Sequence, residues 1–274
     1  MAFEWKTGET LRITAGGKSL EAQCWGPPPG AAPTVVMLHE GLGSLALWRD
    51  FPAKVAEATG FGVFAYSRAG YGRSEAAELP RPLDYMTREA VEVLPEVLDT
   101  IGFRHVVLLG HSDGATIAAI YAGSIEDFRV RGLILMAPHF FTEEGGLAAI
   151  AQAKESFEQG DLKARMAKYL GDPGATFRGW NDAWLDPGFS EWNVGDVIDY
   201  WRIPALVIQG RDDQYGTLAQ VEEVETRSYA PVDTEILDDC GHAPHVDRPD
   251  ETLAAVAEFC TRLERIENVE VEIA

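Results

Sequence analysis

The stretch that most constrains this chain covers residues 106–121. It opens with an apolar run at 106–109, whose length and β-branched content predict a buried strand. From Thr116 onward, apolar residues predict a helix packed on that strand. Between them lies GHSDG at 110–114, a G-x-S-x-G sequence. Glycines on both sides let the backbones pass closely at a sharp strand-to-helix turn, so the pattern predicts an exposed, reactive hydroxyl on Ser112.

A second interpretation of the same serine is structural. Five-residue matches of this kind occur by chance, and a serine in front of a helix commonly serves only as its N-cap. The catalytic interpretation therefore requires a base, an orienting acid and two N–H donors elsewhere in the chain.

Composition narrows the class of protein. The 274 residues suit one sizeable domain, or a core with a smaller insertion, and 46% of them are hydrophobic, as in an ordinary globular protein. A net charge of −21 makes nucleic acid an improbable partner. The three cysteines include no C-x-x-C pair, which favours a reducing compartment over a disulfide scaffold. With neither a signal-peptide pattern nor a long apolar run, we expect a cytoplasmic protein without membrane contact.

The hydrophobic pattern predicts an α/β fold class. Amphipathic helices are expected at 48–59, 87–101 and 251–266, with Thr87 capping the second helix and Pro95 kinking or shortening it. Strands alternating with helices indicate a mostly parallel central sheet covered on both faces. The tail at 268–274 is not assigned. Further strands are predicted at 10–14, 19–25, 34–38, 61–66, 130–136, 203–208 and 234–237.

Residues 139–201 interrupt this alternation. Helical patterns at 147–159 and 162–170 give way to a segment punctuated by glycine and proline. Four of the seven tryptophans lie in this segment. The aromatic content is typical of an apolar binding pocket, and equally of the segment's own core.

Two short sequences resemble a phosphate-binding and a zinc-binding motif, but each lacks a residue that its motif requires. GKS at 17–19 resembles the end of a phosphate-binding loop, but the position five before Gly17 is Arg12. HE at 39–40 resembles the start of a zinc-binding helix, but Gly43 stands where the second histidine belongs. The spacing of His242 and His245 suits a metal pair without an evident third ligand. We therefore predict neither a metal nor a cofactor.

Five short sequences occur in the order known from α/β-hydrolase-fold proteins, and the chain resembles this superfamily, in particular its serine esterase-like members with a cap. The resemblance covers nearly the whole length. It implies a core domain formed by 1–138 and 202–274 and a helical cap insertion at 139–201. The sequences are HEGLGS at 39–44, GYGRS at 70–74, GHSDG at 110–114, GRDD at 210–213 and GH at 241–242.

The chain departs from the family pattern in two places. Glu40 stands where the family usually has a glycine, which changes the polarity of the loop expected to bind an oxyanion. Ser67 and Ala69 replace the usual Asp and Arg before Gly70, and we expect this change to affect only structural hydrogen bonds. Glu40 itself is interpreted as an acceptor for loop N–H groups.

The resemblance assigns the catalytic roles. A serine hydroxyl is too weakly acidic to attack an acyl carbon unaided, so Ser112 needs a base. His242 follows a predicted strand and matches the family's histidine loop, while His245 is the alternative base. The family's G-x-x-D pattern places the orienting acid at Asp213, with Asp212 as its alternative. A further candidate for the acid is Glu143 or Glu144.

The remaining candidate residues follow from the resemblance for the oxyanion hole, and from their positions in the chain for the others. Backbone N–H groups of Gly41 and Asp113 are expected to form the oxyanion hole. His39 and His111 are expected to pack and hydrogen-bond rather than act as bases. Candidate substrate contacts are His139, Trp180 and Trp184.

The sequence thus predicts a serine hydrolase that cleaves a small carboxylic ester, lactone or thioester through an acyl-enzyme intermediate. Its substrate is expected to be a small molecule with an apolar or aromatic acyl group. Carbon–carbon bond hydrolysis or lyase chemistry uses the same residues and stays open. A ligand receptor that keeps the fold with little turnover is an alternative of another class.

Overall fold

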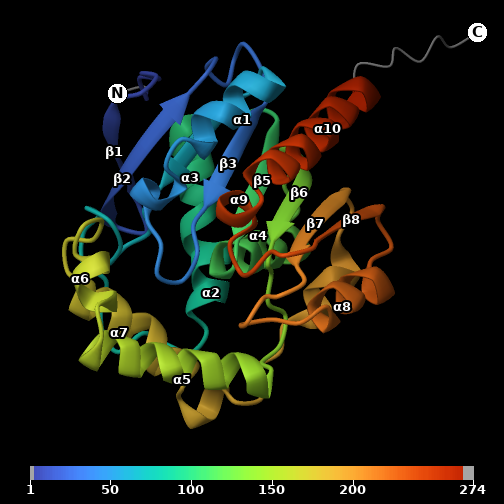
Figure 1. The fold of residues 1–274 in the computed structure, drawn as a ribbon. Coiled ribbons are helices and arrows are strands. Elements are labelled where there is room, and N and C mark those ends of the chain that lie inside the picture. Colours follow the sequence, from blue (N-terminus) through green and yellow to red (C-terminus); the bar gives the residue numbers. More distant parts are fainter. Residues whose placement is uncertain (1–2, 268–274) are drawn as a thin grey trace, which may run out of the picture.

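The computed structural model describes residues 3–267, which form a central sheet of eight strands covered by helices (Figure 1). In chain order the strands are β1 (Thr10–Ala15), β2 (Lys18–Trp25), β3 (Thr34–Leu38), β4 (Gly62–Tyr66), β5 (Val106–His111), β6 (Val130–Met136), β7 (Ala205–Gly210) and β8 (Val232–Leu237). Their order across the sheet is β1-β2-β4-β3-β5-β6-β7-β8. The β1–β2 and β2–β4 pairs are antiparallel and the other neighbours are parallel. The predicted fold class is confirmed.

Helices lie on both faces of the sheet. On one face, α1 (Phe51–Thr59) packs beside α10 (Pro249–Glu267) (Figure 1). The other face carries α3 (Leu94–Ile101) and α4 (Asp113–Ser124), the helix that follows the serine turn. Within residues 3–267, no helix combines the length and the apolar character needed to cross a membrane. The other helices are α2 (Tyr85–Arg88), α5 (Glu144–Gln159), α6 (Leu162–Met166), α7 (Pro173–Trp184), α8 (Ala219–Arg227) and α9 (Pro244–Asp247), with short turns η1 (Leu45–Trp48), η2 (Glu89–Val93), η3 (Pro187–Phe189) and η4 (Gly195–Tyr200).

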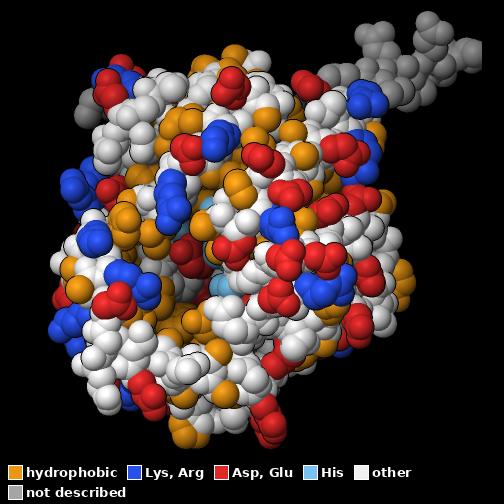
Figure 2. All heavy atoms as spheres, in the orientation of Figure 1, with side chains coloured by type: hydrophobic (Ala, Val, Ile, Leu, Met, Phe, Trp, Pro, Cys, Tyr) orange, Lys and Arg blue, Asp and Glu red, His pale blue; other side chains and the backbone are white. Residues whose placement is uncertain are grey.

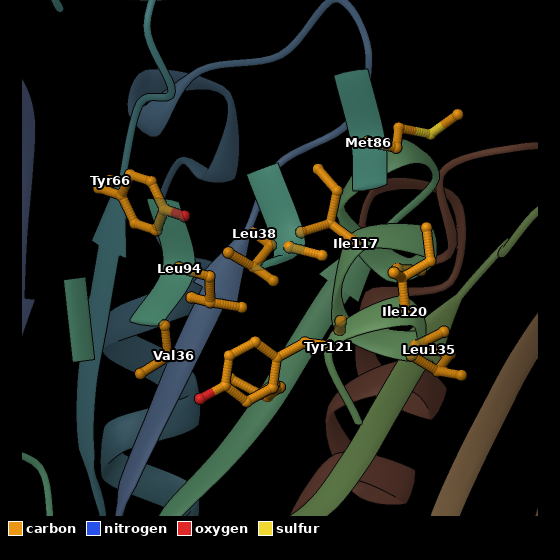
Figure 3. Close-up of a cluster of buried hydrophobic side chains, with 14 of the residues drawn as sticks. Val36, Leu38, Tyr66, Met86, Leu94, Ile117, Ile120, Tyr121 and Leu135 are labelled. Atoms are coloured by element: carbon orange, nitrogen blue, oxygen red, sulfur yellow. The ribbon is translucent and has the colours of Figure 1, made fainter. Parts of the chain in front are cut away.

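The central strands contribute to two hydrophobic cores, one on each face. In β3, Val35 and Met37 join the core under α1 and α10, whereas Val36 and Leu38 join the core under α3 and α4. Figure 3 shows the second core, where Ile117 of α4 packs among side chains of the sheet. Because both faces are buried, these strands read as continuous apolar runs rather than alternating ones.

Residues 87–101 are helical as predicted, but the helical stretch starts earlier and is not regular. The chain forms α2 from Tyr85, then the wide π-type turn η2, and only then α3. Thr87 lies inside α2 and does not cap it. Pro95 is the second residue of α3, directly after this wide turn, where the regular hydrogen bonding that a proline cannot join is already interrupted.

Further differences concern helices with weak sequence signals. The helix predicted at 162–170 ends already at Met166. Neither α7 nor α8 was expected, because α7 contains Pro173 at its start and two glycines, and α8 presents few apolar residues. Asp172 caps α7 by accepting a hydrogen bond from the N–H of Ala175 at 2.9 Å. The unassigned tail lies outside the described residues.

Between β6 and β7 the chain makes a long excursion that contains α5, α6 and α7. Two backbone hydrogen bonds join its ends: Thr142 N–H donates to the carbonyl of Trp192 at 3.2 Å, and Val194 N–H donates to that of Phe140 at 2.7 Å. We call this closure the neck. After the neck, η4 packs on α4 before the chain enters β7. The excursion falls within the predicted cap insertion; its status as a separate domain stays a prediction.

Candidate active site

Ser112 lies on the sharp turn between β5 and α4. Its backbone φ is 53° and ψ is −121°, a conformation that residues other than glycine rarely adopt. A Cβ placed on Gly110 would overlap the backbone of Gly114, and one placed on Gly114 would overlap the carbonyl of Leu38. The turn therefore requires both glycines, and it holds the serine at the carboxyl end of the strand.

The loops after β7 and β8 bring Asp213 and His242 together. The Nδ1 of His242 lies 2.8 Å from Oδ2 of Asp213, which also accepts from Nε2 of Gln209 at 2.9 Å. Since a carboxylate can only accept, Nδ1 carries a proton, and in the neutral form of this ring Nε2 is the acceptor. Burial alone would raise the pKa of Asp213, but His242 and the N–H of Tyr215 hold that pKa at about 2.

The alternative candidates for the base and the acid, His245, Asp212 and Glu143 or Glu144, are not paired in this way. Asp212 is exposed. The imidazole of His245 is buried, and its ring centre lies 5.0 Å from that of Trp48. Glu143 accepts hydrogen bonds from the N–H and the hydroxyl of Thr217, and Glu144 begins α5 at the surface.

Gly41 belongs to the loop that is expected to bind an oxyanion. Arg68 holds the backbone of this loop through hydrogen bonds. This guanidinium donates through Nη1 to the carbonyl of His39 and through Nη2 to that of Glu40 at 3.1 Å. Nδ1 of His39 also bonds to the Glu40 carbonyl at 2.8 Å, and its Nε2 accepts from the Arg68 N–H at 3.0 Å. Burial and the Arg68 charge lower the pKa of His39 well below its ordinary value, so this ring is neutral.

The side chain of Asp113, next to the serine, is fully buried. Its Oδ2 accepts from the Tyr85 hydroxyl at 2.5 Å and lies 3.9 Å from Nη2 of Arg68. Trp184 donates through Nε1 to the same hydroxyl at 3.0 Å. Burial raises the pKa of Asp113, while Arg68 and Tyr85 act against this rise. A buried carboxylate beside the proposed nucleophile is therefore compensated mainly by one arginine.

The replaced family positions carry structural hydrogen bonds. The Ser67 hydroxyl accepts from the N–H of Leu45 at 2.9 Å and donates to Glu21 at 3.0 Å. The carbonyl of Ala69 accepts from Arg81 at 3.0 Å. These bonds tie the turn after β4 to its neighbours.

A cavity of about 160 Å³ opens beside Ser112. Figure 2 shows a hollow on this face of the molecule with acidic and histidine side chains inside it. Trp180 packs so closely on Gly41 that a Cβ there would overlap the indole ring. The lining residues are Glu40, Gly41, Leu42, Ser112, Asp113, His139, Ile150, Trp180, Trp184, Tyr215 and His242.

All three residues expected to contact substrate lie on the wall of this cavity. His139 follows β6, and its ring centre lies 5.6 Å from that of His242 and 5.5 Å from that of Trp184. Burial, with the nearby His242, lowers the pKa of His139 to about 4, so its ring is neutral at neutral pH. Together with Trp180, these side chains give the cavity a largely aromatic wall.

A model of the alpha/beta hydrolase family matches residues 35–256. The chain belongs to this family. The solved structures similar to it include an enol-lactonase from Burkholderia xenovorans, with a TM-score of 0.72 and 20% identity over 92% of this chain and 100% of the lactonase. At this identity the match shows the fold alone.

Relatives of this hydrolase-family chain carry several activities in their names. A proline iminopeptidase of Lactobacillus delbrueckii is 24% identical over 77% of this chain and 84% of its own length. A 1-acylglycerol-3-phosphate O-acyltransferase of Sus scrofa is 32% identical over 42% of this chain. The chain spans about a third of the length of that acyltransferase.

Sequence reasoning missed three residues at the site of this α/β hydrolase. Arg68, two residues after the end of β4, carried a usable signal, because a charge so close to a buried strand needs a partner. Tyr215, whose ring centre lies 4.8 Å from that of His242, and Ile150 on α5 carried none. Their roles depend on how the excursion folds over the sheet.

Proposed function

We propose that this protein is a serine hydrolase that cleaves a small carboxylic ester, lactone or thioester. The observation that carries the proposal is the 2.8 Å bond from Asp213 to His242, since His242 and Ser112 line the same cavity. The strained turn presents the serine hydroxyl, and the carboxylate fixes the imidazole tautomer that can accept the hydroxyl proton.

In the proposed reaction, Nε2 of His242 takes the proton of Ser112 as the serine oxygen bonds to the acyl carbon. The N–H groups of Gly41 and Asp113 stabilise the negative charge on the carbonyl oxygen. Collapse expels the alcohol, which receives the proton from His242 and leaves an acyl-serine. Water then attacks the acyl carbon while His242 takes its proton, and His242 returns this proton to the serine oxygen as the bond to the acyl group breaks and the acid leaves. These steps use only groups of the chain itself, without a cofactor.

The size and the lining of the cavity suit a small apolar acyl group. Its volume of about 160 Å³ is close to that of an engineered protein cavity of about 150 Å³ that holds benzene. Trp180, Trp184 and Ile150 contribute apolar surface, so a benzoyl or short aliphatic acyl group fits the site better than a charged one.

We also propose a cytoplasmic location. All three cysteines are buried as free thiols, which suits a reducing compartment. Fractionation of the source cells with an antibody tests this proposal, and recovery outside the cytoplasm would contradict it.

The test of the activity is hydrolysis of p-nitrophenyl acetate and butyrate by wild type, Ser112→Ala and the matched control Ser124→Ala. Ser124 is exposed at the end of α4, so its replacement should change nothing. We expect multiple turnovers and fluorophosphonate labelling in wild type and control, and the loss of both in Ser112→Ala. Ester turnover that survives Ser112→Ala would refute the proposed nucleophile. Labelling without ester turnover would favour carbon–carbon bond hydrolysis or a ligand-binding role.

A further inference from the structure

The carboxylate of Glu40 lines the catalytic cavity, although the proposed reaction gives it no role. An uncompensated negative charge here would oppose the developing oxyanion. The backbone of Glu40 is fixed, because its carbonyl accepts from Arg68 and His39. The side chain extends toward the ring of His111, whose Nδ1 lies 3.6 Å from Oε2 of Glu40.

His111 links this carboxylate to the loop of the proposed base. It directly precedes the serine and is 2% exposed. Its Nε2 lies 2.6 Å from the backbone carbonyl of His242, and because a carbonyl only accepts, Nε2 must carry a proton. The opposite nitrogen, Nδ1, is buried without a hydrogen-bond partner among the described residues and faces the Glu40 carboxylate at ion-pair distance, so a second proton there would make the ring an imidazolium paired with Glu40.

The other titratable groups around this ring do not replace Glu40. The rings of His242 and His245 lie 5.1 Å from that of His111, and Asp213 lies behind His242. Burial lowers the pKa of His245 to about 3, so that neighbour is neutral. Burial alone would lower the pKa of His111, but Glu40 and the His242 carbonyl raise it above its ordinary value.

We propose that Glu40 and His111 are positioning residues for the base. Glu40 holds His111 as a cation, and this cation both fixes the backbone of His242 and neutralises the carboxylate beside the oxyanion loop. This inference rests on the proposed function, since it assigns a task to the pair only if His242 is the base.

Gly43 leaves the space in which the carboxylate lies. A Cβ placed on Gly43 would overlap the carboxyl group of Glu40. Because that group ends a flexible side chain, an alanine there can be accommodated by rotating the carboxylate away from His111. Gly43→Ala therefore separates the pair while keeping both of its members. The matched control is Gly145→Ala, since nothing lies within 4 Å of a Cβ at that position.

The kinetic test compares wild type with Glu40→Gln, His111→Gln, the double variant and Gly43→Ala on p-nitrophenyl butyrate. We expect kcat to fall on the order of 10-fold in each, with KM within about twofold, because the base is displaced and not the substrate. The double variant should lose no more than the worse single variant, since the two residues act as a unit. Unchanged kcat in Glu40→Gln and Gly43→Ala would overturn the proposal.

A second measurement is independent of activity. In protein labelled with ¹⁵N-histidine, the signals of His111, assigned by their loss in His111→Gln, should show both ring nitrogens protonated at pH 7.5. Glu40→Gln should leave only one protonated. A neutral His111 in active wild type would overturn the ion pair, whereas a charged His111 in a protein without hydrolase activity would refute the proposed function instead. If His111→Gln does not fold, Gly43→Ala provides the assignment, because the displaced carboxylate shifts the same signals.

Discussion

Replacing Arg68 with methionine should destabilise the protein mainly through Asp113. Both side chains are at most 1% exposed, and their charged groups lie 3.9 Å apart. Methionine keeps much of the apolar stem but leaves the buried carboxylate without its compensating charge. Removing one member of a buried ion pair typically costs about 3–5 kcal/mol. We therefore expect a loss of about 4 kcal/mol in the free energy of unfolding at pH 7.5.

The loss should depend on pH with a definite sign. Burial already raises the pKa of Asp113, and the loss of Arg68 raises it further. In Arg68→Met the folded state then binds a proton at a pH where the unfolded carboxyl, with a pKa of about 3.9, does not. Because the folded state binds more protons, the stability of the variant rises as the pH falls. The deficit relative to wild type should be smaller at pH 5.0 than at pH 7.5.

Urea unfolding at both pH values measures this deficit. The matched control is Arg68→Met combined with Asp113→Asn, in which no buried charge is left unpaired. We expect this double variant to recover about 2 kcal/mol or more at pH 7.5. A deficit below about 1 kcal/mol, or one that is equal at the two pH values, would show that Arg68 does not compensate Asp113.

Three further variants test other parts of the site. Asp213→Asn should reduce kcat roughly 1,000-fold or more while the protein stays folded, because the imidazole loses its fixed tautomer, as steady-state kinetics and circular dichroism can show. Gly114→Ala should lower the free energy of unfolding by about 3 kcal/mol in thermal denaturation, since its methyl group would overlap the carbonyl of Leu38; Gly145→Ala should not. Ile150→Ala enlarges the cavity, so a series of p-nitrophenyl esters should show an optimum shifted to longer acyl chains; an unchanged optimum would place the acyl group elsewhere.

The sheet could be predicted because its central strands are buried on both faces. The runs at 34–38 and 130–136 coincide with β3 and β6, and each contains four consecutive apolar residues, 35–38 and 133–136, which a surface strand would not tolerate. Helices that are stabilised by only a few contacts were harder to predict. In α8 only Val221 and Val224 join the core as apolar side chains, which is too sparse a pattern to distinguish from a loop.

The proposed catalytic residues could be located because short motifs place them at the ends of strands. Their surroundings could not. Glu40 was expected to accept from loop N–H groups, but its carboxylate lies 3.6 Å from Nδ1 of His111 at the end of β5, a proximity that depends on the sheet order. Likewise, the pairing of Arg68 with Asp113 follows from the parallel arrangement of β3, β4 and β5 and not from any local pattern.

The neck lies between the part of the chain that carries the proposed catalytic residues and the part that carries most of the proposed substrate contacts. Ser112, Asp213 and His242 are all carried by the sheet and its loops, whereas Ile150, Trp180 and Trp184 belong to the excursion that the neck closes. Since backbone hydrogen bonds hold the two ends of the excursion together, we expect changes of length or sequence inside it to leave β6 and β7 in place. We expect the excursion to be exchangeable as a unit. Grafting a different excursion between Thr142 and Trp192 should alter which molecules enter the cavity, provided that Trp180, which packs on Gly41, and Trp184, which donates to Tyr85, are kept.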